Sequence, residues 1–188
     1  MILSDVTIEE YVDSGKIQIF PEFDKADIRP TGIRVHLGYE ILVPVENQVI
    51  DISKPIEIRY ERLSLSEKGY LLKRDKFILA STYERIMTPR NIVCHLEGRS
   101  TIARLGLSIH CTSGIIDSNH DEARSIVLEM KNIGVFDLMI QPKNQIGMVV
   151  FSELSTLIRQ QSQSQYKNQN SVTPPNLHFI SDKHKRRS

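Results

Sequence analysis

The chain has 188 residues, 40% hydrophobic and 25% charged, which suits a single globular domain with a core of its own. Its formal net charge of +1 argues against a surface built to wrap a polyanion such as nucleic acid. Two cysteines without CxxC spacing indicate a reducing compartment, and the chain shows neither a signal peptide nor a membrane-spanning run, so we expect a cytoplasmic protein.

The first predicted element is a short helix, after which the pattern changes to strands. Ser4 or Asp5 can cap the helix, residues 7–14 carry apolar side chains at helical spacing, and Gly15 ends it. Short strand-like segments bounded by turns follow at residues 16–20, 33–37, 40–43, 49–52, 56–60, 70–72, 77–80, 92–96, 107–111, 125–131, 138–140 and 147–151. This succession predicts an all-β sandwich or barrel, interrupted by one helical turn at residues 100–105.

The composition changes after residue 152. Residues 160–165 are only glutamine and serine, and such a polar run buries too little apolar surface to order itself. We therefore divide the chain into a β domain, residues 1–159, and a C-terminal tail, residues 160–188. Because residues such as Tyr166 and Leu177 offer anchors, the tail is either disordered or a lid that orders over a ligand.

One candidate site is the motif Gly98-Arg99-Ser100-Thr101, with Arg104 one turn later. Glycine lets the backbone approach an anion, hydroxyls and main-chain amides can donate to it, and arginines add charge-assisted bonds. The motif fits a phosphate cradle, but taken alone it equally fits a capped turn with solvated arginines.

A second candidate is Glu129, a carboxylate within the apolar strand of residues 125–130. If the strand alternates, Val127 and Glu129 share a face that is either exposed or part of a pocket, where Glu129 can act as a general base. Asp117 is either an acceptor for a ligand hydroxyl or a turn residue. No histidine or cysteine pair has metal-ligand spacing and the zinc-deaminase signature is absent, so any deamination would proceed without zinc at the base.

The order of these motifs resembles the dCTP deaminase branch of the dCTP deaminase/dUTPase family. The resemblance runs through LEGRSTIARLGL at residues 96–107, HCTSG at 110–114, Asp117 and IVLE at 126–129, and further segments extend it over nearly the whole chain. It implies a distorted β-barrel or jelly-roll of the dUTPase-like type, assembled as a homotrimer whose active sites are shared between subunits. It also favours the functional interpretation of Arg99, Ser100, Arg104 and Glu129.

The resemblance implies hydrolysis of dCTP to dUTP and ammonia, supplying dUTP or dUMP for thymidylate synthesis. Glu129 would activate a water for attack at C4 of cytosine, Asp117 would accept from the deoxyribose 3′-hydroxyl, and Ser113 would lie near the water. The backbone of Ile126 and Val127 would read the base edge. The triphosphate, together with Mg²⁺, would be bound by Arg99, Ser100, Thr101 and Arg104, and the tail residues Gln165 and Gln169 would close over the phosphates. Tyr166 would be a further substrate-binding residue of this tail.

Two features keep other activities open. Residues 118–124, SNHDEAR, stand where the family has a glycine and an aromatic residue, with His120 near the place of the aromatic. Gly114 after Ser113 resembles dUTPase-like and bifunctional members. The alternatives are a bifunctional dCTP deaminase/dUTP diphosphatase, a dUTPase, or a nucleotide-binding trimer that has lost catalysis.

Overall fold

The computed structural model describes residues 1–21, 23–118, 120–159, 166 and 169–177. Its helical elements are α1 (Asp5–Asp13), η1 (Lys25–Asp27) and α2 (Ser100–Ala103). Its strands are β1 (Gln18–Phe20), β2 (Ile28–Arg29), β3 (Gly32–His36), β4 (Glu40–Pro44), β5 (Tyr60–Ser64), β6 (Tyr70–Leu72), β7 (Phe77–Met87), β8 (Ile92–Gly98), β9 (Leu107–Ser108), β10 (Ile115–Ile116), β11 (Arg124–Asn132), β12 (Leu138–Ile140) and β13 (Gln145–Glu153). The predicted mainly β fold with a short N-terminal helix is confirmed.

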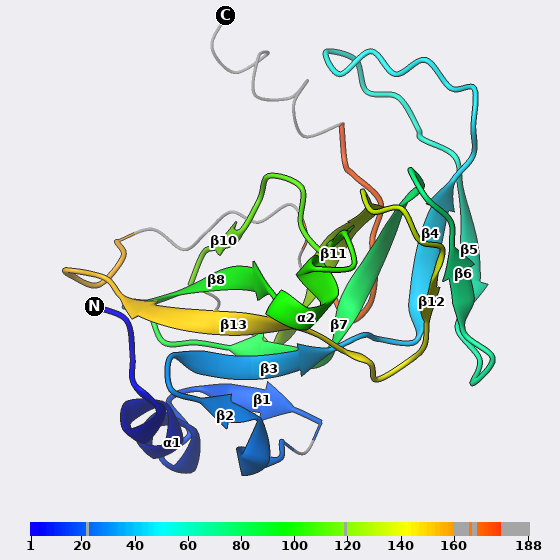
Figure 1. The fold of residues 1–188 in the computed structure, drawn as a ribbon. Helices are drawn as coiled ribbons and strands as arrows, with labels where there is room; N and C mark the ends of the chain where they lie inside the picture. Colours follow the sequence, from blue (N-terminus) through cyan, green and yellow to red (C-terminus); the bar gives the residue numbers. More distant parts are fainter. Residues whose placement is uncertain (22, 119, 160–165, 167–168, 178–188) are drawn as a thin grey trace, which may run out of the picture.

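The strands form two larger sheets and one separate pair (Figure 1). One sheet has the order β10-β8-β13-β3-β2, the other has β5-β4-β7-β11-β9 with β1 also on β7, and β12 pairs with β6. Neighbouring strands run antiparallel, and many of the pairs join segments that are distant in the sequence. Both large sheets contribute to the core, for example through Val35 and Phe151 of the first and Ile78 and Leu128 of the second, each 0% exposed.

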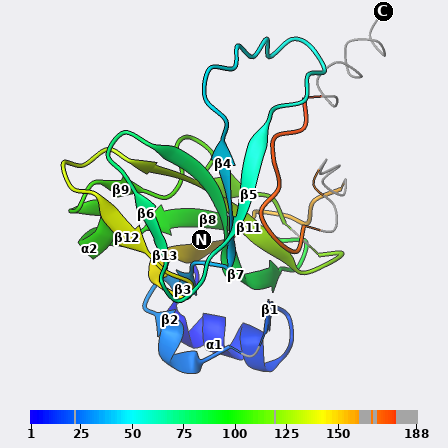
Figure 2. The same ribbon diagram turned by 90° about the vertical axis from the view of Figure 1, so that its right-hand side faces the viewer.

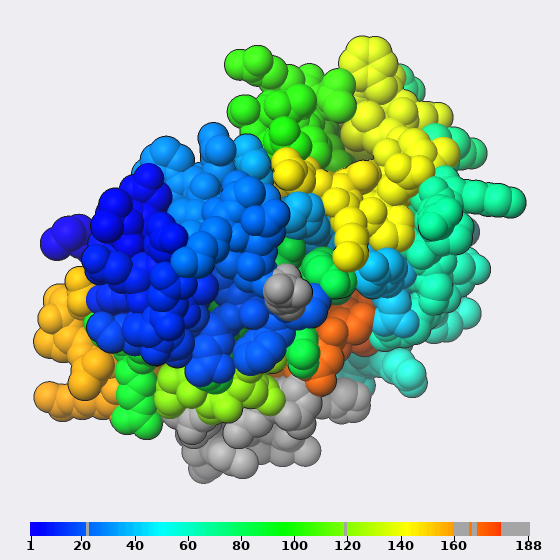
Figure 3. Space-filling view, turned by 90° about the horizontal axis from the view of Figure 1, so that it is seen from below, coloured from blue at the N-terminus to red at the C-terminus, as the bar shows by residue number. Residues whose placement is uncertain are grey.

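The N-terminal helix α1 covers the end of the molecule next to β1 and β2 (Figures 1 and 3). Ser4 caps it by accepting the Thr7 N–H, and Ile8 is buried against the core. The backbone of Leu3 donates to the Phe151 carbonyl at 2.9 Å, which ties the start of the chain to β13.

Two of the predicted strands are wrong. Residues 48–59 contain no strand, and β5 starts only at Tyr60. The apolar side chains that suggested strands there, Val49 and Ile52, are 92% and 73% exposed on a loop that extends away from the sheets (Figure 1, cyan). Alternation alone does not make a strand, because a strand also needs a partner for its backbone and a surface for its side chains. Conversely, the short strands β2 and β10 were not predicted.

An irregularity in the pairing of β7 with β11 decides where the functional residues lie. Ser125 pairs with Arg85 and Val127 with Ser81, so residues 82–84 of β7 face Ile126 alone. The Ile126 N–H is bonded instead by the Thr82 hydroxyl at 2.9 Å. Such irregularities redirect side chains, and they are frequent beside active sites.

Candidate functional site

A pocket of 310 Å³ opens where this irregularity lies. Its walls come from β7, β8, β10, β11 and the tail residues Tyr166, Gln169 and Thr173. The consecutive residues Arg124, Ser125, Ile126 and Val127 all border it, and Glu129 follows two positions later. Since a regular strand would turn every second residue away, the break in register is what exposes this run of β11 to one cavity.

Glu129 stands at the junction of two cavities. It lines the first pocket and also a second of 300 Å³, whose walls include the aromatic residues Tyr60 and Phe77. Val127 and Thr173 line both as well. The side chain is half-buried rather than placed on an outer face, so the structure puts this carboxylate in a pocket, one of the two positions that the sequence left open.

The backbone around Cys111 holds the Glu129 carboxylate. The Cys111 N–H donates to Glu129 Oε2 at 3.2 Å, and the thiol lies 3.4 Å from the Glu129 carbonyl oxygen. Burial and the nearby Glu129 charge raise the pKa of the Cys111 thiol, while Lys131 opposes the shift. Cys111 is therefore a neutral neighbour that orients the carboxylate through its amide.

Asp117 and Ser113 line the first pocket from the segment around β10. β10 is attached to β8, where Ile115 pairs with His95 and Ile116 with Cys94. This pairing brings Asp117 and Ser113 to the same cavity as Glu129, although β10 and β11 belong to different sheets. Ile126 and Val127 border the cavity too, with the Ile126 N–H already bonded to Thr82.

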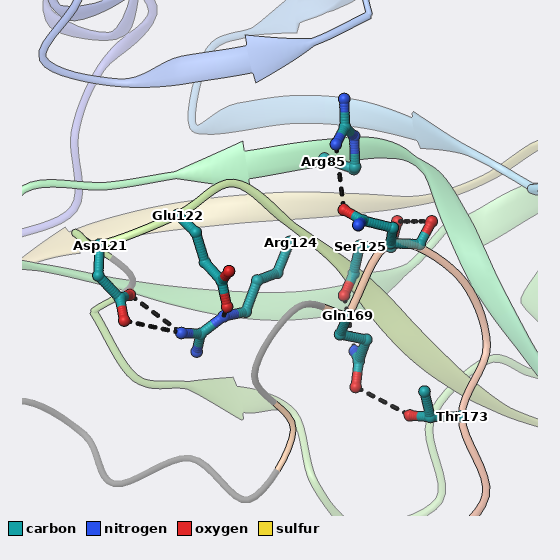
Figure 4. A network of polar contacts seen from close by, with 8 residues as sticks. Arg85, Asp121, Glu122, Arg124, Ser125, Gln169 and Thr173 are labelled. Atoms are coloured by element: carbon teal, nitrogen blue, oxygen red, sulfur yellow. Dashed lines mark hydrogen bonds and ion pairs between the residues drawn. The ribbon is translucent and has the colours of Figure 1, made fainter.

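The C-terminal segment 169–177 forms the remaining wall, and Figure 4 shows its contacts with β11. The Ser125 N–H donates to the Gln169 carbonyl at 3.0 Å, and Gln169 Nε2 donates to the Ser125 carbonyl at 2.8 Å. Thr173 Oγ1 donates to Gln169 Oε1 at 3.0 Å. Val172, 1% exposed, anchors the segment against Leu42 and Leu79.

Two other tail residues, Tyr166 and Gln165, were predicted to bind the substrate. Tyr166 lines the first pocket, and its hydroxyl accepts the Asn176 N–H at 3.3 Å. Gln165 lies outside the described residues, so its predicted role stays a prediction. The described part of the tail thus closes one side of the pocket by bonding to the backbone of β11 at Ser125.

The predicted phosphate cradle lies elsewhere in the chain. α2 begins after Arg99, which has an extended backbone and makes no side-chain cap. None of the four predicted phosphate ligands lines the Glu129 pocket or the second cavity, and all four are exposed: Arg99, Ser100, Thr101 and Arg104. Figure 2 shows α2 on the opposite side of the molecule from residues 169–177 (dark orange), and in Figure 3 the green segment around residue 100 lies far from the yellow-green start of β11.

Arg124 is a pocket residue that sequence reasoning did not identify. Its Nε donates to Glu122 Oε1 at 2.6 Å, and its Nη2 lies 3.0 Å from both carboxylate oxygens of Asp121 (Figure 4). All three residues belong to the charged stretch 118–124 that departs from the family pattern. The unusual charge of this stretch was the sequence feature that could have identified Arg124. However, Arg124 lies five residues from Glu129, and in a regular strand residues an odd number apart point to opposite faces.

In the part of the chain that the structure describes, no group of three or more histidine, cysteine, aspartate or glutamate side chains is arranged to hold a metal ion. No helix of that same part of the chain has the length and apolar character needed to cross a membrane.

Comparison with known proteins gives one consistent result. A family model described as dCTP deaminase-like matches residues 2–154. The "dCTP deaminase, dUMP-forming" of Methanobrevibacter smithii is 34% identical over 160 residues, covering 82% of this chain and 81% of that protein. The dCTP deaminase of Psychromonas ingrahamii is 38% identical over 166 residues, covering 82% and 84%.

A solved structure shows the same fold. The 2′-deoxycytidine 5′-triphosphate deaminase from Agrobacterium tumefaciens superposes with a TM-score of 0.62 at 16% identity. The match covers 80% of this chain and 47% of that one, so this chain spans about half the length of the Agrobacterium protein.

Proposed function

The chain belongs to the dCTP deaminase-like family, and we propose that it hydrolyses dCTP to dUTP and ammonia with Glu129 as general base. The observation that carries this proposal is the position of Glu129. It is a half-buried carboxylate, oriented by a backbone N–H, that lines a pocket large enough for part of a nucleotide. We place this reaction in the cytoplasm.

In the proposed reaction, Glu129 removes a proton from water as the water oxygen bonds to C4 of cytosine. Glu129 passes this proton to N3 and then transfers the second proton, from the new C4 hydroxyl, to the amino group. The bond between C4 and the exocyclic nitrogen breaks, the C4 carbonyl forms, and ammonia leaves. A positioned base contributes roughly 10²–10⁴-fold to such a reaction. Ile86, Ile116 and Ile126 line the same pocket, and these apolar side chains would limit the access of bulk water to the reacting atoms. The carboxylate alone activates the water, so this scheme uses no zinc.

The remaining pocket residues orient the nucleoside. Asp117 would accept from the 3′-hydroxyl, Ser113 would lie beside the attacking water, and Ile126 and Val127 would contact the base through their backbone. Gln169 and Tyr166, which already form the wall of the pocket, would contact the substrate from the tail, together with Gln165. Such positioning lowers the barrier by holding the reactants in place rather than by chemistry.

The triphosphate would be bound by α2 of a neighbouring copy. Arg99, Ser100, Thr101 and Arg104 are exposed and lie away from the Glu129 pocket of their own chain, so a site that contains both needs two chains. A homotrimer with three such interfaces satisfies this requirement with one repeated contact. Mg²⁺ would enter with the nucleotide, because it prefers phosphate oxygens and water to an all-protein cage.

A second candidate function is favoured by the names of relatives. The Methanobrevibacter smithii protein is called dUMP-forming, so a bifunctional enzyme that also removes pyrophosphate is the nearest alternative. Incubation with dCTP and Mg²⁺, followed by chromatography of the nucleotides, separates the candidates. Accumulation of dUTP supports the deaminase, dUMP with pyrophosphate supports the bifunctional enzyme, and dCTP that binds but persists would show a binding protein.

A further inference from the structure

The strongest unexplained feature of the pocket is the guanidinium of Arg124. It lines the cavity that holds Glu129 and Asp117, and its side chain is only 13% exposed. A buried arginine is costly unless its charge is paired and its N–H groups are bonded. Asp121 and Glu122 supply the pairing, both from the turn just before β11.

The pairing uses only part of the guanidinium. Nε is bonded to Glu122 and Nη2 to Asp121, whereas Nη1 has no hydrogen-bond partner among the described residues. Figure 4 shows this remaining terminal nitrogen turned away from both carboxylates. Nη1 is not among the buried unpartnered atoms, so its two N–H donors are open to the cavity and available to an oxygen acceptor bound there.

The charge around Arg124 indicates which kind of oxygen fits. Asp121 and Glu122 already compensate the charge of the guanidinium. Arg124 therefore offers hydrogen-bond donors rather than an unpaired positive charge, which suits a neutral hydroxyl or ether oxygen better than a phosphate. The two carboxylates also hold the guanidinium in a single orientation, so the N–H groups of Nη1 point in fixed directions.

The position along β11 separates Arg124 from the reacting base. It lies five residues before Glu129, which is up to about 16 Å along an extended strand. Asp117, the proposed acceptor for the 3′-hydroxyl, lines the same cavity as Arg124. A nucleoside whose C4 faces Glu129 would therefore present its sugar rather than its base to Arg124.

We propose that Arg124 is a specificity-determining residue that donates from Nη1 to a hydroxyl oxygen of the nucleotide sugar. This inference rests on the proposed function, which sets the orientation of the nucleotide with cytosine at Glu129. It goes beyond that function because it assigns recognition of the sugar to a residue of the charged stretch 118–124. The hydroxyl is the 3′-hydroxyl that every deoxynucleotide carries or the 2′-hydroxyl of a ribonucleotide, and the two cases differ in their consequences. Recognition of a 2′-hydroxyl would make the pocket accept CTP as well as dCTP.

The test compares three triphosphates that differ only in their sugar hydroxyls: CTP, dCTP and 2′,3′-dideoxy-CTP. Binding is measured by calorimetry on the full chain with Glu129→Gln in all samples, so that no nucleotide is converted during titration. Arg124→Met is compared with Arg124 intact, and Arg74→Met is the matched control, because Arg74 also pairs with a carboxylate, Asp75, but is 63% exposed and lines neither cavity of the site.

Loss of a charge-assisted hydrogen bond is expected to weaken binding about 10- to 100-fold. The proposal predicts this loss for hydroxyl-bearing nucleotides and a change below about threefold for dideoxy-CTP. Loss for dCTP and CTP alike identifies the 3′-hydroxyl, and loss for CTP alone identifies the 2′-hydroxyl. An equal loss for all three nucleotides, as phosphate binding or local unfolding would produce, overturns the proposal, and so does the absence of any loss.

Arg124→Lys is the second variant, because it keeps the positive charge if Arg124→Met does not fold. Lysine cannot span both carboxylates and still direct donors at the sugar, so the same hydroxyl-selective loss is expected at smaller size. Deamination of dCTP is measured separately on the unmodified chain. Its absence would refute the proposed activity while leaving the binding comparison valid, and turnover with no hydroxyl selectivity would refute only the role of Arg124.

Discussion

Replacing Glu129 with glutamine should abolish deamination while leaving the fold and nucleotide binding intact. The amide oxygen of glutamine can still accept the Cys111 N–H that bonds Glu129 Oε2 at 3.2 Å, and the side chain is half-buried rather than part of the core. The free energy of unfolding should therefore change by less than about 1 kcal/mol. An amide cannot accept a proton from water at neutral pH, so the base contribution of roughly 10²–10⁴-fold is lost, equivalent to about 2.7–5.4 kcal/mol of barrier.

The assay follows conversion of cytosine to uracil in dCTP by absorbance, with calorimetric binding of dCTP to the variant as the second measurement. Urea denaturation of both proteins provides the control for folding. A variant that binds dCTP normally and turns over at more than about a third of the original rate would refute the assignment of Glu129 as base, since a group required for proton transfer contributes far more. A variant that neither binds nor folds normally would contradict the structural part of the reasoning.

Three further predictions address the shared site, the thiol and the tail. Mixing Arg104→Ala subunits with Glu129→Gln subunits should restore about a quarter of the original activity, because about a quarter of randomly formed interfaces combine an intact Arg104 with an intact Glu129. No recovery of activity would mean that each site lies within one chain. Alkylation of Cys111 should be slow at neutral pH because burial and the Glu129 charge raise its pKa, and it should accelerate in Glu129→Gln, where the pKa falls toward its usual value; an equal or slower rate would contradict this. Val172→Ala removes about 1.5 kcal/mol of burial that anchors the tail, so the Ser125 amide should exchange its hydrogen faster, and unchanged exchange would show that the tail is anchored elsewhere.

Local sequence made Glu129 and Asp117 candidates, one as a carboxylate among apolar strand residues and the other as an acceptor after two isoleucines, each with a structural alternative. The resemblance to the dCTP deaminase/dUTPase family is what favoured their functional roles. The structure brings both to one cavity, together with Ser113, Ile126, Val127, Tyr166 and Gln169. The strands predicted at residues 16–20 and 125–131 correspond to β1 (Gln18–Phe20) and β11 (Arg124–Asn132), since alternation reflects which face is buried.

The remaining features depend on contacts between distant segments. The break in register opposite Ile126 arises where residues 82–84 of β7 leave the ladder, and nothing in residues 124–129 alone reveals it. This break makes Arg124 a wall of the pocket. The exposed loop at residues 48–59 has a strand-like pattern but no partner strand, and pairing is a property of the whole fold rather than of a segment.

The separation of α2 from the Glu129 pocket is the clearest case of this kind. In the sequence, Arg99 and Arg104 are only a few tens of residues from Glu129, and their order suggested one continuous site. The structure places them on another side of the same chain, exposed and outside the pocket. Sequence order can suggest that such residues act together, but it does not specify whether they meet within one chain or across an interface.

The most direct test of the central claim is the stoichiometry of ammonia release from dCTP. The unmodified full chain is incubated with dCTP and Mg²⁺, ammonia is measured by a coupled enzymatic assay, and consumed dCTP is measured in the same samples. The account predicts one ammonia for each dCTP consumed, whether the nucleotide product is dUTP or dUMP. Consumption of dCTP without ammonia, or dCTP that remains unchanged at saturating protein, would contradict it.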